Sequence, residues 1–273
     1  MPAPNLHNSG DIKEEPLIEL LTLREVDEAR VSGQFVAKTL AALRERIEPG
    51  TNLLEINDWA ASMIRAAGAR SCYVDYAPSF GRGPFGKVIC TSVNDAVLHG
   101  LPHDYVLKDG DLVTLDFAAS VNGWVTDSAI SFVVGNSAAP EDIRMIETTE
   151  KALLAGIGAP QPGARIGDIS HAIGTVLEAA GFQVNTQFGG HGVGSTMHQD
   201  PHIPNIGKPG RGYVLRPGLL LAIEPWVMDG TSRLVTAPDG WTLCSSNGRR
   251  TAHSEHTVAV TESGPVVLTQ LAQ

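Results

Sequence analysis

Two aspartates on neighbouring strands of a predicted β-hairpin have the spacing expected of a divalent metal site. The hairpin covers residues 111–133, and its turn is Asn122-Gly123, the dipeptide most typical of a two-residue loop. With that loop, Asp116 faces Ala129, and Asp127 becomes its diagonal neighbour on the same face of the sheet. The Cβ atoms of such neighbours are about 7–8 Å apart, a span that one or two metal ions bound by both carboxylates could bridge.

The surroundings of Asp116 favour a cation partner over an ordinary surface position. The alternative is that both aspartates face solvent near strand ends, as single strand aspartates usually do. Asp116, however, lies in the apolar run 113–119, where a buried charge is costly unless a cation pairs with it. No Lys or Arg lies between Lys108 and Arg144. The cation therefore comes from elsewhere in the fold or is a metal ion.

Two glutamates and a histidine-containing segment supply further candidate ligands. Glu224 ends one apolar strand, and Glu255 precedes another. The Gly-rich segment 189–202 contains His191 and His198, which the flanking glycines allow to approach another group closely. Four carboxylates in one cleft need counter-ions. Together with one imidazole they suit a pair of divalent ions such as Mn²⁺, Fe²⁺, Co²⁺ or Zn²⁺, which would hold a bridging water and lower its pKa.

The remaining histidines differ in the chemistry that their positions allow. His99 ends an extended segment, where it is suited to be a general acid or a hydrogen-bond donor. The roles of His202 and His256 stay open. Ordinary surface or core positions are expected for His7, His103, His171 and His253.

The composition is that of a soluble globular protein, with 42% hydrophobic and 18% charged residues among 273. A net charge of −10 argues against general affinity for nucleic acid or an anionic membrane. Three scattered cysteines are too few for a disulfide framework or a thiolate zinc site, so we expect a reduced, cytoplasmic protein. The N-terminus shows no secretory signal, and no apolar run is long enough to span a membrane.

Capping signals and apolar periodicity predict four helices around the hairpin. Thr22 and Glu25 have the spacing of a capping box at the start of the first helix. The expected helices cover residues 22–47, 53–67, 140–155 and 166–180, and further strands are expected near residues 87–92 and 257–261. We expect residues 1–20 to form a mobile tail and residues 21–273 to form a single catalytic domain.

The two halves of the chain resemble each other. Turn and helix-end signals recur in the same order, namely Pro49-Gly50 and residues 66–68 in one half and Pro162-Gly163 and residues 179–181 in the other. Residues 108–117 also resemble residues 216–225, which places Asp116 and Glu224 in equivalent positions. This pattern predicts a duplicated helix–helix–strand unit with pseudo-two-fold symmetry. Acids from both halves would then converge in a cleft between them.

The chain resembles the type I methionine aminopeptidases in five segments that occur in the family's order and spacing. These segments are TSVNDAVLHG (Thr91–Gly100), TLDFAASVNGWVTD (Thr114–Asp127), GHGVGSTMHQDP (Gly190–Pro201), AIEP (Ala222–Pro225) and SEHT (Ser254–Thr257). The resemblance extends over roughly residues 21–267. It implies the pita-bread α+β fold, a curved antiparallel sheet backed by two helix pairs related by a pseudo-two-fold axis.

The resemblance also implies a role for each site residue. The metal ligands would be Asp116, Asp127, His191, Glu224 and Glu255. Asp127 and Glu255 would bridge two metal ions, and Glu224 would take up the proton of the nucleophilic water. His99 and His198 would steady the substrate carbonyl, the tetrahedral intermediate or the leaving nitrogen. The methionine side chain would lie against Phe85, Cys90 and Trp241, and with a weaker match against Cys72 and Tyr76.

The implied reaction is removal of the initiator methionine from new chains whose second residue is small. The partners would then be nascent polypeptide N-termini, with the ribosome as a further candidate, and we expect a monomer because no exposed apolar helix suggests an interface. Two features depart from the family's pattern: the loop 77–86 is longer, and Met197 stands where an aromatic residue is frequent. The alternatives are a proline-directed peptidase, which usually carries a large N-terminal domain, and a pita-bread protein that only binds partners.

Overall fold

A computed structural model describes residues 18–79 and 81–271. Most of the predicted tail, residues 1–17, lies outside the described residues. Two residues at the end of the tail contact the rest of the fold: Ile18 packs against a core cluster, and the Glu19 carboxylate accepts hydrogen bonds from the Ser195 backbone N–H (2.8 Å) and the Gln199 side chain (2.9 Å). No helix among the described residues is both long enough and apolar enough to cross a membrane.

Four helices form where capping signals predict them. They are α1 (Leu23–Arg46), α2 (Leu53–Ala67), α3 (Pro140–Gly158) and α4 (Ile166–Ala179). The capping box at the start of α1 is confirmed, since Thr22 and Glu25 bond each other's backbone N–H groups. Helix α2 ends at Gly68 in a left-handed conformation that favours glycine. Helix α3 continues three residues beyond the predicted end at Ala155.

Fourteen short strands are described. They are β1 (Arg70–Ser71), β2 (Cys90–Val93), β3 (Ala96–Leu98), β4 (Leu112–Val121), β5 (Trp124–Val133), β6 (Gly189–Gly192), β7 (Gln199–Pro204), β8 (Leu220–Ile223), β9 (Trp226–Met228), β10 (Leu234–Thr236), β11 (Leu243–Ser245), β12 (Thr251–His253), β13 (His256–Thr261) and β14 (Gly264–Val267). The strand predicted near residues 87–92 begins later, at Cys90. All strand pairs are antiparallel.

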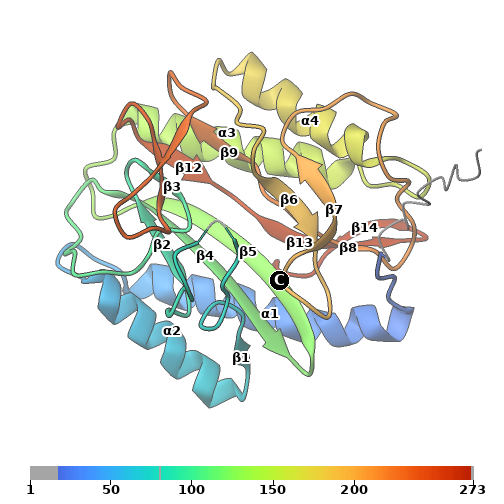
Figure 1. Cartoon of the computed structure of the whole chain (residues 1–273), viewed down its shortest axis with the longest axis horizontal. Coiled ribbons are helices and arrows are strands. Elements are labelled where there is room, and N and C mark those ends of the chain that lie inside the picture. The colour runs from blue at the N-terminus through green and yellow to red at the C-terminus, as the bar shows by residue number, and fades with distance from the viewer. Residues whose placement is uncertain (1–17, 80, 272–273) are drawn as a thin grey trace, which may run out of the picture.

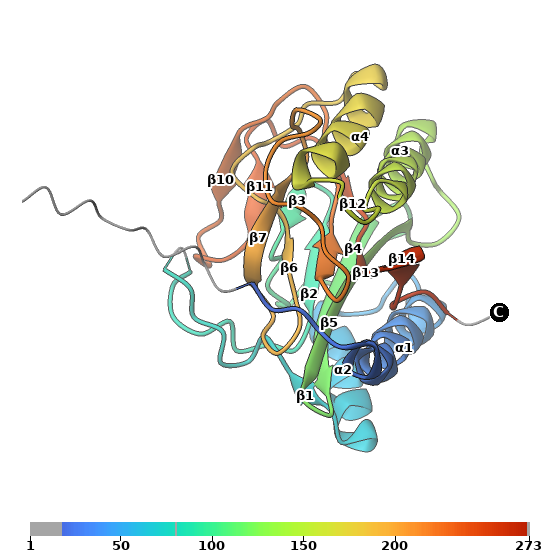
Figure 2. The ribbon, with the colours of Figure 1, turned by 90° about the vertical axis from the view of Figure 1, so that its right-hand side faces the viewer.

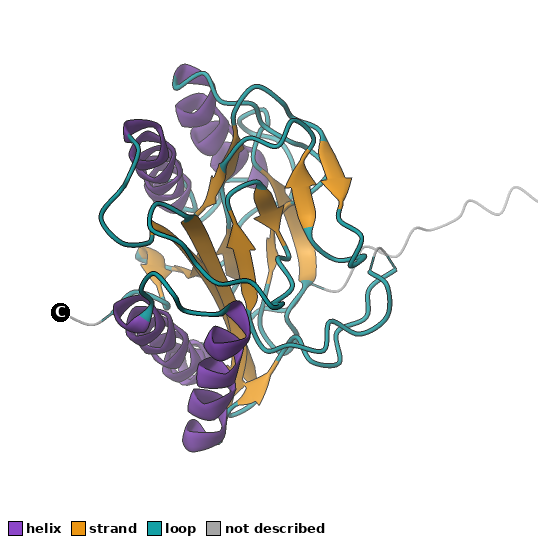
Figure 3. Cartoon of the chain, turned by 90° about the vertical axis from the view of Figure 1, so that its left-hand side faces the viewer, coloured by secondary structure: helices purple, strands orange, loops and turns teal. Residues whose placement is uncertain are grey.

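The strands form a curved layer with the four helices on one side of it (Figures 2 and 3). Helices α1 and α2 lie beside β4 and β5, whereas α3 and α4 lie over the half that contains β6, β8 and β13 (Figure 1). Each helix pair encloses its own apolar cluster, with Leu43, Ile56 and Phe117 in the first and Ile169, Ile173 and Leu221 in the second. Two similar halves are what the duplicated sequence predicts, and their α+β layout is the one that the family resemblance implies.

Equivalent backbone hydrogen bonds confirm that the two halves are built alike. The Gly50 N–H donates to the Leu107 carbonyl (2.8 Å), and at the matching place the Gly163 N–H donates to the Leu215 carbonyl (3.1 Å). All three pairs of matching glycines have positive φ, and these pairs are Gly50 with Gly163, Gly68 with Gly181, and Gly110 with Gly218. The repeat in the sequence is therefore a repeat of backbone conformation.

The hairpin of β4 and β5 has the predicted register. Asp116 pairs with Ala129 and Ala118 pairs with Asp127, so the two aspartates are diagonal neighbours. The turn residues Asn122 (φ 53°) and Gly123 (φ 90°) both adopt the positive φ of a two-residue hairpin loop. The two-residue turn fixes this register. A slip of one residue would move every side chain of one strand to the opposite face of the sheet.

Candidate metal centre and active site

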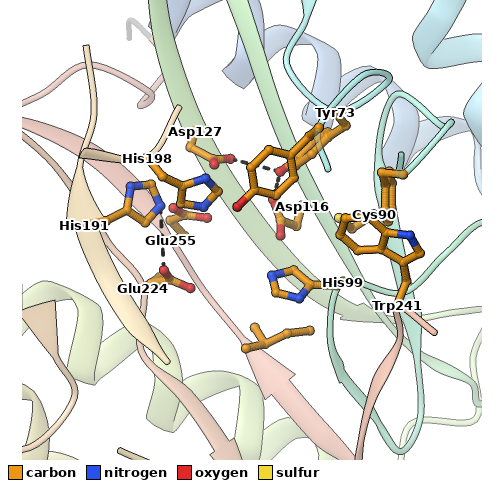
Figure 4. A pocket seen from close by; sticks show the side chains of 13 residues that line it. Tyr73, Cys90, His99, Asp116, Asp127, His191, His198, Glu224, Trp241 and Glu255 are labelled. Carbon is orange, nitrogen blue, oxygen red and sulfur yellow. Dashed lines mark hydrogen bonds and ion pairs between the residues drawn. The ribbon is translucent and has the colours of Figure 1, made fainter. Parts of the chain in front are cut away.

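One pocket collects all ten residues that the sequence predicts for the site (Figure 4). Its lining combines carboxylates, imidazoles and aromatic rings. The lining residues are Tyr73, Tyr76, Phe85, Cys90, Leu98, His99, Asp116, Asp127, His191, His198, Glu224, Trp241 and Glu255. Cys72 and Met197 are not among them, although both belong to the apolar cluster that contains Phe85 and Trp241.

Strand pairing brings the four acids together. Glu255 forms an isolated bridge with Ala129, the residue that faces Asp116 across the hairpin, through backbone hydrogen bonds of 3.0 and 3.3 Å. Glu224 follows β8, which pairs with β13 next to Glu255. Two acids therefore come from the first half of the chain and two from the second.

The His191 imidazole presents its Nε2 atom to these acids. Its Nδ1 lies 2.9 Å from the carbonyl of Gly192, to which an Nδ1–H donates, so Nε2 keeps a free lone pair. Nε2 lies 3.8 Å from Glu224 Oε1. Burial lowers the pKa of His191 to about 3, so the ring is neutral at pH 7. A neutral imidazole held by a backbone carbonyl is the usual form of a metal-binding histidine.

The donor set fits a divalent cation. One ligand atom each from Asp127, His191 and Glu255 lies within 4.8 Å of the other two. Glu255 Oε1 is buried without a hydrogen-bond partner. Burying an ionised carboxylate oxygen without a partner costs free energy. Burial raises the pKa of Asp116 to about 6 and that of Glu224 to about 8, and the nearby charge of Asp116 adds to the shift of Glu224. A divalent cation would offset the cost of ionising these buried acids.

These pKa shifts predict how pH affects the stability of metal-free protein. An unfolded histidine has a pKa of about 6.5, so above about pH 7.5 the histidines are almost entirely neutral both folded and unfolded. Glu224, with its raised pKa, still binds more protons folded than unfolded, so the free energy of unfolding falls as pH rises through about 8. We expect the Tm of chelator-treated protein to fall by a few degrees between about pH 7.5 and about pH 9. Bound Mn²⁺ should reverse this trend, because it binds the deprotonated carboxylates.

Calorimetry at both pH values, with and without Mn²⁺, checks this prediction. A metal-free Tm that rises over this interval would contradict it.

The other side of the pocket is aromatic and carries two further imidazoles. The centroid of the His198 ring lies 4.3 Å from that of the His191 ring. The His198 ring also stacks on Tyr76, with the ring centroids 5.1 Å apart. The rings of Phe85 and Trp241 meet edge to face at 5.1 Å. Desolvation of the rings in the pocket lowers the pKa values of His99 and His198 to about 4, although His198 as a whole residue is exposed. Both are therefore neutral at pH 7, and each ring carries one N–H donor.

The structure adds two residues that the sequence did not indicate. His253 was assigned an ordinary position, but its Nε2 lies 3.6 Å from Glu224 and 4.0 Å from Glu255, buried and without a hydrogen-bond partner. The sequence does contain a signal for His253. It lies two residues before Glu255, and residues two apart on an extended segment point to the same side. Tyr73 lies in a loop without periodicity, and its hydroxyl donates to Asp116 Oδ1 (2.6 Å).

A curved antiparallel sheet backed by two equivalent helix pairs, with carboxylates and imidazoles from both halves in one pocket, defines a metal-dependent hydrolase of the pita-bread fold. The model of metallopeptidase family M24 matches residues 27–262. The chain therefore belongs to metallopeptidase family M24.

Curated relatives and solved structures agree with this membership. The chain is 41% identical to methionine aminopeptidase 1 of Bacillus subtilis over 251 residues, which is 92% of this chain and 98% of the relative. It is 43% identical to methionine aminopeptidase 1 of Mycobacterium tuberculosis over 253 residues, 90% and 92% of the two chains. The structure of methionine aminopeptidase from Thermotoga maritima matches with a TM-score of 0.88 and 36% identity over 93% of this chain and all of that one.

The prolidase of Pyrococcus furiosus shares the fold at lower similarity. It matches with a TM-score of 0.71 and 21% identity, and the match covers 93% of this chain but only 66% of the prolidase.

Proposed function

We propose that this protein removes the N-terminal methionine from polypeptides whose second residue is small. The observation that carries the proposal is the joint presence, in one pocket, of the carboxylates with His191 and of an apolar wall formed by Phe85, Cys90 and Trp241. Relatives at about 40% identity that are named methionine aminopeptidase support the same activity. The substrates would be the N-termini of nascent chains.

In the proposed centre, Asp116, Asp127, His191, Glu224 and Glu255 would hold two divalent ions, with Asp127 and Glu255 as the ligands common to both. The hard, oxygen-rich set suits Mn²⁺, Fe²⁺ or Co²⁺, and also Zn²⁺. Such ions supply positive charge that lowers the pKa of an attacking water and neutralises charge on the substrate carbonyl.

Glu224 would accept the proton of the attacking water. Its carboxylate lines the pocket and lies 3.8 Å from His191 Nε2, which supports this role. Glu224 can then pass the proton to the leaving amine, as a general acid.

His99 and His198 would orient the peptide bond. As neutral rings at the pocket wall, each can donate one hydrogen bond, to the carbonyl oxygen as it becomes negative or to the leaving nitrogen. Stacking against Tyr76 sets the orientation of His198. The methionine side chain would lie against Phe85 and Trp241, whose rings offer apolar surface to its thioether. A narrow pocket excludes bulky second residues sterically, and this discriminates more sharply than a missing methylene does.

Hydrolysis of two peptides tests the proposal. Protein stripped with chelator and refilled with Mn²⁺ or Co²⁺ is given Met-Ala-Ser and Ala-Pro-Ala, and released amino acids are measured. We expect metal-dependent release of methionine from the first peptide alone. Cleavage of only the second would make the protein a proline-directed peptidase, and cleavage of neither, with metal bound, would indicate a protein that only binds partners.

A further inference from the structure

The Tyr73 phenol connects the carboxylates to the aromatic side of the pocket. Tyr73 follows β1, whose pairing with the far end of β4 holds this part of the chain beside the hairpin. Its side chain is buried, with 5% of its surface exposed. The hydroxyl lies 2.6 Å from Asp116 Oδ1 and 3.5 Å from Asp127 Oδ1. Dashed lines in Figure 4 mark both contacts. The mechanism above gives Tyr73 no role.

The direction of this hydrogen bond follows from the groups involved. A metal-binding carboxylate is ionised and can only accept, whereas a phenol carries one O–H. Tyr73 therefore donates to Asp116, and the distance of 2.6 Å is that of a charge-assisted O–H···O⁻ bond. Such a bond uses a lone pair of Oδ1 and restricts rotation of the carboxylate.

The other end of Tyr73 is held by the apolar wall. Its ring packs on Phe85 with centroids 5.6 Å apart and planes tilted by 49°. Phe85 is 4% exposed and meets Trp241 edge to face, so the phenol cannot move without displacing this wall. One side chain thus contacts both the acid proposed to bind a cation and the ring proposed to contact methionine.

We propose that Tyr73 is a positioning residue that orients the Asp116 carboxylate toward the cation. This role rests on the metal centre of the proposed function and assigns to it a hydrogen-bond donor that lies outside the set of ligands. Donors of this kind fix ligand orientation in metal sites, and their loss typically lowers metal affinity or activity by about 10–100-fold.

The test is the substitution Tyr73→Phe, which removes the hydroxyl and keeps the ring on Phe85. Metal affinity is measured by titration calorimetry with Co²⁺ alone, the ligand environment by the visible absorption of bound Co²⁺, and kcat and KM separately with Met-Ala-Ser. We expect Co²⁺ affinity or kcat to fall by about 10–100-fold, the Co²⁺ spectrum to change, and KM to stay near the wild-type value.

Tyr105→Phe is a matched control. Tyr105 also donates to a buried aspartate, Asp111, at 3.0 Å, but neither residue lines the pocket. We expect this variant to keep the wild-type Co²⁺ affinity, spectrum and kcat.

The outcomes separate this role from the proposed function. Wild-type protein that binds no Co²⁺ would overturn the proposed function and this role together. Wild-type binding with an unchanged Tyr73→Phe variant would overturn the role of Tyr73 alone. A variant altered only in KM would also overturn it, because Tyr73 would then act through packing in the methionine pocket.

Discussion

Glu224→Gln is expected to lower kcat for Met-Ala-Ser by about 10²–10⁴-fold at saturating metal. Glutamine has nearly the same size as glutamate and can still offer an oxygen, but it cannot accept a proton from water and return it. Because only 13% of the side chain is exposed where it lies in the pocket beside His191, bulk water is poorly placed to replace it. Steady-state kinetics at saturating Mn²⁺, with KM measured in parallel, check this expectation.

Asp142→Asn is the control for Glu224→Gln. Asp142 is also a buried carboxylate, 2% exposed, but it pairs with Arg250 outside the pocket. Loss of this buried pair should lower the Tm and leave kcat per folded molecule unchanged. A Glu224→Gln enzyme with more than a tenth of the wild-type kcat would contradict the assignment of Glu224 as the general base.

Asp127→Asn is expected to abolish turnover through loss of metal. Asp127 shares the three-residue cluster with His191 and Glu255, so its neutralisation removes charge at the centre of the ligand set. Removal of a group that only orients a metal ligand already lowers metal affinity by about 10–100-fold. Loss of a carboxylate proposed to bind both ions should therefore cost more than about 100-fold for at least one of them. Titration calorimetry with Mn²⁺ and metal analysis after dialysis measure this loss.

The same substitution should stabilise the protein when metal is absent. Burial and the nearby charges of Asp116 and Glu224 raise the pKa of Asp127 well above its usual range, so the ionised side chain destabilises the metal-free fold. We expect metal-free Asp127→Asn to have a higher Tm than metal-free wild type at about pH 8. Asp104→Asn, a change at an exposed carboxylate that accepts a hydrogen bond from Asn52, should leave metal binding intact. A variant that binds two Mn²⁺ ions with wild-type affinity would rule out Asp127 as a shared ligand.

Comparison of His253 with His191 shows where prediction from sequence ends. The glycines around His191 and His198 mark both as candidates, and the structure has the close approach that they allow: a Cβ on Gly192 would lie 2.2 Å from the carbonyl oxygen of Asp200. For His253 the sequence offers only its position two residues before Glu255, which places both on the same side of an extended segment. Its place beside Glu224 depends on the pairing of β12 with β9, which no local pattern records.

Local chemistry in the sequence determined the hairpin register, the helix boundaries and the acids of the pocket. An Asn-Gly turn, capping residues and buried charges each restrict a few neighbouring residues, so they can be recognised without the rest of the fold. The tertiary structure alone decided which side chains support the acids. Tyr73 and Asp116 are 43 residues apart in the chain, and the Tyr73 loop has no periodicity to orient its side chains. Their hydrogen bond exists because the pairing of β1 with β4 and the packing of Phe85 bring the phenol to the carboxylate.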